Sequence, residues 1–372
     1  MKLSLMQENL ARGLQVVSRA VSSRTTLPVL SNVLLRTEDA GLKLTSTNLE
    51  IGISAWVPGR IDTEGAVTVP ARLFADLVAG LPAGERVDLE LDGQASLHVK
   101  AGRTQTTLRG IDADEFPVVP APGERPNTRI SQRILRKALG EVVFAAATDE
   151  ARPILTGVLT RFAGDSLTLA AADNYRIAVV TVPTLDPLEE TSIVVPARSY
   201  SELMRIMGDT DDPVEIMLAS AKSQVLFHVE GIDLVSRLID GQFPNYQQVL
   251  PTSHGTRAVV DRDDLLKAVR LSALIASSAA NVVKLRVGDN GAGTISIAAA
   301  ADVGDAQTEV EASVDGDPVQ IAFNARYLQD ALQNVDAEQV ALEFLGPLSP
   351  GVMRRLDDDK YVHVIMPVRT PS

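Results

Sequence analysis

Three similar four-residue motifs stand along this chain at nearly constant spacing. Val69-Pro70-Ala71-Arg72 recurs as Val195-Pro196-Ala197-Arg198 and, in a weaker form, as Phe323-Asn324-Ala325-Arg326. The motif arginines are 126 and then 128 residues apart. Repetition at a fixed period is typical of a chain built from copies of one structural unit. The 372 residues are therefore predicted to fold as three tandem modules.

The residues after each motif predict an amphipathic helix, because apolar side chains recur there at positions i, i+3, i+4 and i+7. The three sets are Phe74, Leu77, Val78 and Leu81; Tyr200, Leu203, Met204 and Met207; and Leu328, Ala331, Leu332 and Val335. Another helix is predicted at the start of each module, with Asp261 as the N-cap of the third one. Strands of alternating pattern follow each helix, so a module reads helix, strands, helix, strands.

Two stretches rich in turn residues, 120–127 and 251–255, separate the modules. We place the domains at residues 1–123, 124–252 and 253–372. Phe116-Pro117 near the end of the first module returns as Phe243-Pro244 near the end of the second. Several such repeated motifs in the same order favour triplication over chance similarity.

The charged residues are distributed unevenly. A net charge of −13, taken alone, argues against a nucleic-acid partner. The arginines and lysines nevertheless concentrate on the predicted helices, whereas the acidic residues lie largely in hairpins and loops. Helices that shared one surface would make it basic, and it would bind phosphates without sequence preference. The plainer alternative is that these side chains only solubilise an exposed face.

The composition also bears on location. The chain has no cysteine, which excludes disulfides and thiolate metal sites. No apolar run reaches the roughly 18 residues that a membrane span needs, and the N-terminus has no apolar core of a signal peptide. We therefore expect a cytoplasmic protein with no membrane partner.

The sequence does not indicate a catalytic centre. It contains neither a G-x-x-x-x-G-K-[ST] phosphate loop nor a G-x-S-x-G elbow, and its four histidines are scattered without metal-ligand spacing. The acidic runs at 112–115 and 357–359 could hold a divalent ion, although solvated acidic loops are the simpler interpretation. We expect no cofactor and no metal. The alternative, an enzyme on a repeated scaffold, would need a unique polar cluster in a single module.

Longer segments resemble the bacterial DNA sliding clamp, the β subunit of the replicative DNA polymerase III, essentially from end to end. The first module carries the resemblance in Arg24-Thr25-Thr26-Leu27-Pro28-Val29-Leu30-Ser31-Asn32. The second carries it in Ala172-Asp173-Asn174-Tyr175-Arg176-Ile177-Ala178 and in Ile239-Asp240-Gly241-Gln242-Phe243-Pro244-Asn245-Tyr246. The third ends in Val364-Ile365-Met366-Pro367-Val368-Arg369.

The resemblance implies an α+β fold in which three modules form a half-ring, with sheets outside and helices inside. Two chains would close head to tail around duplex DNA as a homodimer, after a clamp loader opens the ring. The implied role is processivity: the ring tethers the replicative polymerase, other polymerases and repair proteins, and it catalyses nothing. Such a protein would be associated with the nucleoid. The alternative within this resemblance is a paralogue specialised for drug resistance or repair.

The resemblance and the charge pattern together imply DNA contacts. We expect Arg24 and Arg152 to make them, supported by a further set of basic residues: Arg72, Arg103, Arg136, Lys137 and Arg198. For ring closure, the expected interface joins apolar residues of the first module to those of the third: Leu73, Leu77 and Leu108 with Leu274 and Ile275. Arg103 is expected to pair there with acidic residues such as Glu309.

The resemblance also implies an apolar pocket between the second and third modules that captures a short linear motif of partner proteins. Its expected residues are Leu155, Asn174, Tyr175, Arg176, Ile177, Pro244, Val249, Met366, Pro367, Val368 and Arg369. The competing interpretation makes Leu155, Ile177 and Val249 ordinary core residues. This chain departs from the family in having Asn174 where glycine is common and in extending to Thr370-Pro371-Ser372.

Overall fold

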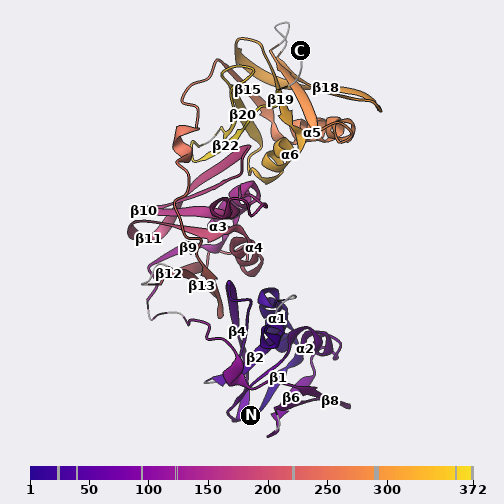
Figure 1. The fold of residues 1–372 in the computed structure, drawn as a ribbon, viewed down its shortest axis with the longest axis vertical. Coiled ribbons are helices and arrows are strands. Elements are labelled where there is room, and N and C mark those ends of the chain that lie inside the picture. Colours follow the sequence, from indigo (N-terminus) through magenta and orange to yellow (C-terminus); the bar gives the residue numbers. More distant parts are fainter. Residues whose placement is uncertain are drawn as a thin grey trace. The chain divides into compact units, whose positions relative to one another are not determined.

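The computed structural model of the chain describes residues 1–22, 26–38, 41–93, 95–121, 123, 125–219, 223–288, 293–356 and 358–369. The chain divides into two compact units (Figure 1). Unit 1 comprises Met1–Gln132 and Glu202–Leu238, and unit 2 comprises Arg133–Ser201 and Ile239–Ser372.

The first module contains two α-helices and a set of antiparallel strands. Its elements are β1 (Lys2–Met6), α1 (Gln7–Val17), β2 (Asn32–Glu38), β3 (Gly41–Thr47), β4 (Ile51–Thr63), β5 (Ala66–Pro70), α2 (Ala71–Ala79), β6 (Arg86–Leu91), β7 (Ser96–Ala101) and β8 (Thr104–Arg109). Short 3-10 turns lie at Ser18–Ala20, Pro28–Ser31 and Ala113–Glu115. Helix α2 begins inside the repeated motif, and Phe74 and Val78 of its predicted apolar face are fully buried.

The second and third modules repeat this order. The second contains β9 (Thr128–Ser131), α3 (Gln132–Val142), β10 (Gly157–Ala172), β11 (Arg176–Pro196), α4 (Ala197–Ile206), β12 (Pro213–Leu218), β13 (Gln224–Val229) and β14 (Ile232–Arg237), with 3-10 turns at Val143–Ala145, Pro153–Thr156 and Tyr246–Gln248. The third contains β15 (Thr256–Asp261), α5 (Arg262–Ala276), β16 (Val282–Val287), β17 (Thr294–Ala301), β18 (Gly304–Gly316), β19 (Val319–Asn324), α6 (Ala325–Asn334), β20 (Gln339–Phe344), β21 (Gly351–Arg355) and β22 (Tyr361–Ile365). The predicted α+β triplication is confirmed, whereas the exact domain boundaries stay a prediction.

Neighbouring modules are joined by strand pairing. The last strand of the second module, β14, pairs antiparallel with β4 of the first, so that Ile232 lies opposite Ala55. The last strand of the third module, β22, pairs in the same way with β11 of the second, so that Tyr361 lies opposite Val180. The second module therefore contributes β9 and β12–β14 to the sheet of unit 1, and β10–β11 to the sheet of unit 2.

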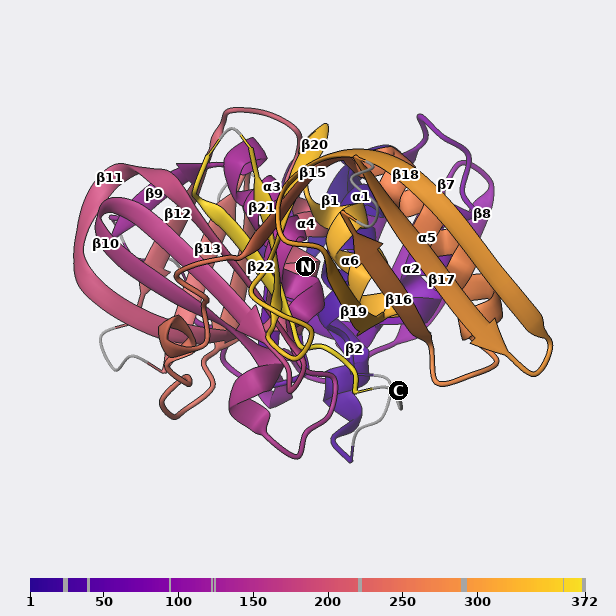
Figure 2. The ribbon, with the colours of Figure 1, turned by 90° about the horizontal axis from the view of Figure 1, so that it is seen from above.

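The helices pack on these sheets through side chains that the sequence pattern predicts. In Figure 1, α1 and α2 lie together beside β2 and β4, and α1 buries Leu10 and Leu14 completely. A Cβ on Gly13 would lie 2.7 Å from Val57 Cγ2, so glycine permits this close approach of helix and sheet. In unit 2, α5 runs along β17 and β18 (Figure 2), and the Asp261 carboxylate accepts bonds from the first-turn N–H groups, as predicted.

Candidate functional site

A pocket of about 220 Å³ lies in unit 2 where the hairpin between β10 and β11 meets the end of β22. It is lined by Arg152, Leu155, Ala172, Asp173, Asn174, Tyr175, Arg176, Ile177, Phe243, Pro244, Asn245, Tyr246, Val249, Val364 and Met366. Eight of the eleven predicted pocket residues belong to this lining. The other three, Pro367, Val368 and Arg369, are not among its lining residues.

The floor of the pocket is part of a hydrophobic core. Leu155, Ile177, Phe243 and Val364 are buried members of one apolar cluster, on which Tyr246 packs from the side. Leu155 and Ile177 are therefore core residues that also line the pocket, whereas their role in capturing a peptide stays a prediction. Val249, by contrast, is more than a third exposed. An apolar floor with more exposed walls is suited to an extended peptide.

The hairpin that forms one wall is stabilised by Asp173. Its Oδ1 accepts hydrogen bonds from the backbone N–H groups of Tyr175 at 2.7 Å and Arg176 at 3.0 Å. The Asp173 N–H donates in turn to the Arg176 carbonyl at 3.1 Å. A short acidic side chain suits this place because it can bond to the backbone two residues further on. The tight turn places Asn174 and Tyr175 at the pocket.

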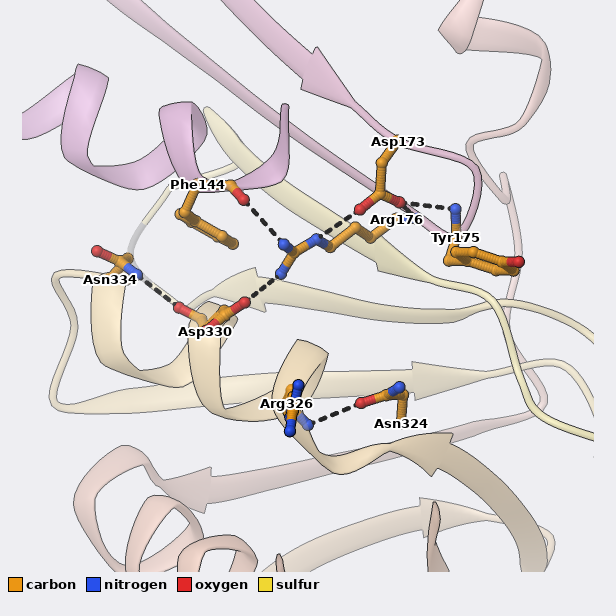
Figure 3. Close-up of polar contacts among 8 residues, drawn as sticks. All are labelled: Phe144, Asp173, Tyr175, Arg176, Asn324, Arg326, Asp330 and Asn334. Atoms are coloured by element: carbon orange, nitrogen blue, oxygen red, sulfur yellow. Dashed lines mark hydrogen bonds and ion pairs between the residues drawn. The ribbon is translucent and has the colours of Figure 1, made fainter. Parts of the chain in front are cut away.

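Arg176 is held beneath the turn by groups from several elements, as Figure 3 shows. Its Nε donates to Asp173 Oδ2 at 3.1 Å and its Nη2 to the Phe144 carbonyl at 2.9 Å. Its Nη1 lies 2.5 Å from Oδ2 of Asp330 on α6. The guanidinium carbon also stands 4.6 Å from the ring centre of Tyr327. The side chain is 10% exposed, so these contacts replace most of its hydration.

Tyr175 connects the hairpin to the end of the chain. Its carbonyl accepts a hydrogen bond from the Met366 N–H at 2.8 Å, and its ring stacks on Tyr327 with centroids 6.0 Å apart. Two residues later, the Val368 N–H donates to the carbonyl of Ala322 on β19. The segment after Met366 therefore runs against β19, which accounts for Pro367–Arg369 lying outside the pocket lining.

A buried histidine lies behind the Arg176 site. The rings of His363 and Phe144 are 5.5 Å apart, and the Arg176 guanidinium carbon is 5.4 Å from the Phe144 centroid. Burial and the nearby charge of Arg176 lower the pKa of His363 to about 3. Neither ring nitrogen has a hydrogen-bond partner within the part of the chain that the structure describes. His363 is therefore a neutral packing residue at ordinary pH, as expected for a strand residue.

The joint between the first and second modules repeats this hairpin in detail. Asn48 Oδ1 accepts from the N–H groups of Glu50 and Ile51, and the Glu50 carbonyl accepts from the Arg237 N–H at 2.9 Å. The two joints differ at one position. Gly52 stands where the second hairpin has Ile177, and an added Cβ would lie 2.7 Å from Val119 Cγ1. At the first joint, Val119, just before the linker, thus covers the position that is equivalent to Ile177.

The predicted DNA-contacting residues have different surroundings. Arg24 lies outside the described residues. Arg103 is in the exposed turn between β7 and β8, while Arg136 and Arg198 are exposed on α3 and α4. Lys137 Nζ lies 2.6 Å from Asp336 Oδ2, so part of its charge is neutralised. Arg152 lines the pocket.

A groove between α1 and α2 also carries basic side chains. It has a volume of about 1030 Å³ and is lined by small residues such as Ala11, Ala71 and Ala75, with Arg12 and Arg72 beside them. The Arg72 side chain is 96% exposed. Sequence reasoning placed these arginines on helices but did not find the groove, because spacing within one helix does not show how two helices pack.

The residues predicted for ring closure fall into three groups. Leu73 on α2 and Leu274 on α5 are exposed, the latter 69%, while Leu77 and Ile275 are half-buried. Leu108 is 4% exposed, so its side chain packs within its own module. Leu271 is also exposed on α5, one turn before Leu274, and sequence reasoning missed it. Its signal was the i, i+3 spacing of two leucines on one helix.

The acidic runs are satisfied locally. Asp112 Oδ1 accepts from the Asp114 N–H in a 3-10 turn, and the Asp358 carboxylate is 3.2 Å from Arg355 Nη1, while Asp357 lies outside the described residues. Within the described ranges, histidine and acidic side chains nowhere gather in threes with metal-binding geometry. Every helix in the same ranges is too short or too polar to cross a lipid bilayer.

Comparison with known proteins covers the whole chain. Residues 1–120, 129–245 and 247–369 match the N-terminal, central and C-terminal domains of the DNA polymerase III beta subunit. The chain is 30% identical to the Beta sliding clamp of Staphylococcus epidermidis, with all of both chains covered. It superposes on the DNA polymerase sliding clamp of Bacillus subtilis with a TM-score of 0.95 and 30% identity, covering all of both chains. For the sliding clamp of Pseudomonas aeruginosa, the TM-score is 0.91 and the identity 32%, again with full coverage.

Proposed function

This chain belongs to the family of the DNA polymerase III β subunit, the bacterial DNA sliding clamp, and we propose on this basis that two copies close head to tail into a ring. A protein of this family encircles duplex DNA and tethers the replicative polymerase; it is a processivity subunit without catalysis of its own. Its hold on DNA is topological, so direct contacts can stay weak enough for sliding. The relatives compared here carry the general clamp name, which favours that role over a specialised paralogue.

The observation that carries the proposal of a ring is a pair of open sheet edges. Within the described residues, β8 has one strand partner, β7, and the first half of β18 has one partner, β17. At both joints inside the chain, the last strand of one module pairs with the long strand of its neighbour. The third joint of this kind would bring β8 of one chain to β18 of another, which buries both edges.

The repeat also predicts the register of that pairing. Each module has an equivalent hairpin, in which two paired residues are five positions apart in the sequence. The three pairs are Thr47–Gly52, Ala172–Ile177 and Ala300–Asp305. Residues 51–55 and 176–180 receive the neighbouring strands at the two joints within the chain. The equivalent residues of β18 are 304–308, and Thr308 would lie opposite Thr104 of the other chain. Continued by one residue, this register places Arg103 opposite Glu309, the pair expected from charge.

A closed dimer has the same contact twice about a two-fold axis. The exposed leucines of α2 and α5 support this contact, because Leu73 on one side and Leu271 and Leu274 on the other would be removed from water. Leu108 contributes through its backbone in β8, since its side chain is already buried. The expected interface is thus a strand pair backed by apolar helix residues.

The DNA contacts follow from the exposed arginines on helices. Arg72, Arg136 and Arg198 can each bond to phosphate oxygens without reading a base, which suits a ring that moves along the duplex. Arg24 is retained as a contact from its place in the family motif. Lys137 and Arg152 are weaker members, because one is ion-paired and the other lines the pocket. The protein would work at the nucleoid, where the duplex DNA of the chromosome lies.

The pocket is the proposed receptor for a short motif of the replicative polymerase subunit, the clamp loader, and other polymerases and repair proteins. Its apolar floor and the Asn174, Tyr175 and Met366 walls support this use. Deleting residues 366–372 is expected to abolish binding of a labelled polymerase-motif peptide while the dimer survives. Deleting residues 370–372 alone is the matched control and should leave the affinity unchanged; equal loss in both deletions would contradict the pocket assignment.

Disulfide trapping tests the ring directly, because the chain contains no cysteine. The repeat makes the Thr104–Thr308 pair equivalent to the Ala55–Ile232 pair. The next pair along these strands, Trp56 and Gly231, is hydrogen-bonded, so Ala55–Ile232 is a non-hydrogen-bonded pair, the kind whose Cα atoms lie closer together. The Cα atoms of residues 104 and 308 would therefore be close enough for a disulfide. T104C/T308C should form covalent dimers on oxidation. T104C/Q307C is shifted by one residue, which turns the second cysteine to the other face, and should not.

The trapped ring then tests topology. Loaded onto a nicked circular plasmid by the clamp loader, T104C/T308C should stay bound after oxidation and leave only when the circle is cut. Retention on cut and uncut DNA alike would mean binding by direct contact. Equal trapping of both cysteine pairs would mean that the dimer uses another register.

A further inference from the structure

Helix α6 contributes no side chain to the lining of the partner pocket, but it contacts two lining residues, Arg176 and Tyr175. Asp330 and Tyr327 both lie on this helix, and neither lines the pocket. Asp330 Oδ2 is 2.5 Å from Arg176 Nη1, and the Tyr327 ring lies under the guanidinium group (Figure 3 shows the Asp330 contact). Asp330 and Arg176 are 154 residues apart in the chain and belong to different modules.

We propose that Asp330 is a positioning residue for the partner pocket: acting through Arg176, it holds the hairpin turn that carries Asn174 and Tyr175 in its peptide-binding position. This inference rests on the proposed function of the pocket. It assigns to Asp330 a part in partner binding, although this residue does not line the pocket.

Arg176 depends on its protein partners because it has little access to solvent. Its three guanidine nitrogens donate to Asp173, Asp330 and the Phe144 carbonyl, and its side chain is 10% exposed. A guanidinium group remains charged at any ordinary pH, so a lost partner cannot be compensated by deprotonation. Little water reaches this site to replace the missing carboxylate. Arg176 would therefore have to move toward solvent, and the pocket is the open side that it lines.

Arg176 is connected to both walls of the pocket. Asp173 binds the guanidinium group with Oδ2 and the turn backbone with Oδ1, so the side chain and the turn move together. The hairpin turn also binds the C-terminal segment, because the Tyr175 carbonyl accepts a hydrogen bond from the Met366 N–H. A displaced Arg176 would therefore shift Tyr175 and Met366, which face the peptide from two sides.

A second ion pair between the same two modules does not involve the Arg176 site. Asp336 lies just after α6 and also makes an ion pair with the second module, at 2.6 Å to Lys137. This pair is exposed, with side-chain exposures of 46% and 67%, and neither residue lines the pocket. Asp336→Asn therefore removes one carboxylate and one ion pair between the same two modules, but it leaves the Arg176 site intact.

The test measures the affinity of a fluorescein-labelled peptide that carries the clamp-binding motif of the same organism's replicative polymerase subunit, by anisotropy on the full-length dimer. Asp330→Asn should raise the Kd by about three- to ten-fold, as expected when a buried guanidinium group exchanges a charged carboxylate partner for a neutral amide. Asp330→Glu should bring it back to within about two-fold of the parent protein, and Asp336→Asn should change it by less than about two-fold.

A double variant gives a readout that loss of stability alone would not. If Asp330 acts through Arg176, Arg176→Met/Asp330→Asn should bind the peptide no worse than Arg176→Met, because the loss of the guanidinium group has already removed the contact with Asp330. Additive losses, an unchanged Kd in Asp330→Asn, or an equal loss in Asp336→Asn would each overturn the inference. A parent protein that does not bind the peptide would instead refute the proposed pocket, so the two failures are distinguishable.

Discussion

Glu141 and Arg355 form an ion pair in which the carboxylate side chain is 1% exposed. Glu141 stands near the end of α3 and Arg355 at the end of β21, 214 residues further on. The other carboxylate oxygen accepts the Asp336 N–H at 3.1 Å, and the Arg355 guanidinium group lies over the Tyr361 ring. Burial raises the pKa of Glu141, and the charge of Arg355 opposes that rise. The pair connects the second and third modules inside unit 2.

Glu141→Ala is expected to lower the free energy of unfolding by about 3–5 kcal/mol, because it leaves the largely buried Arg355 without its principal partner. Lys137→Ala breaks an exposed ion pair at the same joint and should cost about 0–1 kcal/mol. Urea unfolding followed by circular dichroism compares the two variants. Similar losses would show that burial does not determine the strength of these pairs.

The stability of the protein should fall as the solution is acidified, partly because of His363. Its folded pKa of about 3 lies below the ordinary value of 6.5, so protonation favours the unfolded state. The associated stability is fully present above pH 6.5 and is lost as the pH falls toward 3. Between pH 7 and pH 5 this residue alone should account for about 2 kcal/mol. His363→Leu should remove that part of the pH dependence, as measured by urea unfolding at both pH values; an unchanged slope would assign the acid sensitivity to other groups.

Ring closure should depend on the exposed leucine of α5. Leu274→Asp places a charge where the proposed interface buries an apolar side chain, and the dimer Kd should rise by about 100-fold. Leu345→Asp is the matched control, because Leu345 is similarly exposed on the loop after β20. Sedimentation at micromolar and nanomolar concentrations measures both dimers. A Leu274→Asp dimer as tight as the parent would exclude this face of α5 from the interface.

Arg152 should contribute more to partner binding than to DNA contact, since it lines the pocket. Arg152→Ala is expected to weaken the polymerase peptide by about three-fold and to leave the salt dependence of DNA binding unchanged. Arg198→Ala should do the reverse, lowering the slope of log K against log salt by about 0.9 for one lost phosphate contact. If Arg152→Ala lowers that slope instead, the assignment based on the pocket is wrong.

The repeat and the periodic patterns predicted much of the fold because those signals are local. The apolar face of α2 and the Asp261 cap follow from spacings of a few residues. Leu108 was placed at the interface from the family resemblance, which does not show that its side chain is buried within its own module. The Arg176–Asp330 and Glu141–Arg355 contacts could not be predicted, because each pair is more than 150 residues apart and Asp330 fits the polar face of any surface helix.

The two joints with the same hairpin show how copies of one module diverge after triplication. At the first joint, the absence of a side chain on Gly52 allows Val119 to pack against the strand. Both residues belong to the same chain, so this contact is part of the fold. At the second, the side chain of Ile177 takes up this space, and an open pocket lies between it and Tyr246. In the proposed function, the first joint is thus filled by the chain's own Val119, whereas the second is left open for a segment of another protein. A ring of two chains would contain two such pockets, so two partner proteins could be bound to one ring at the same time.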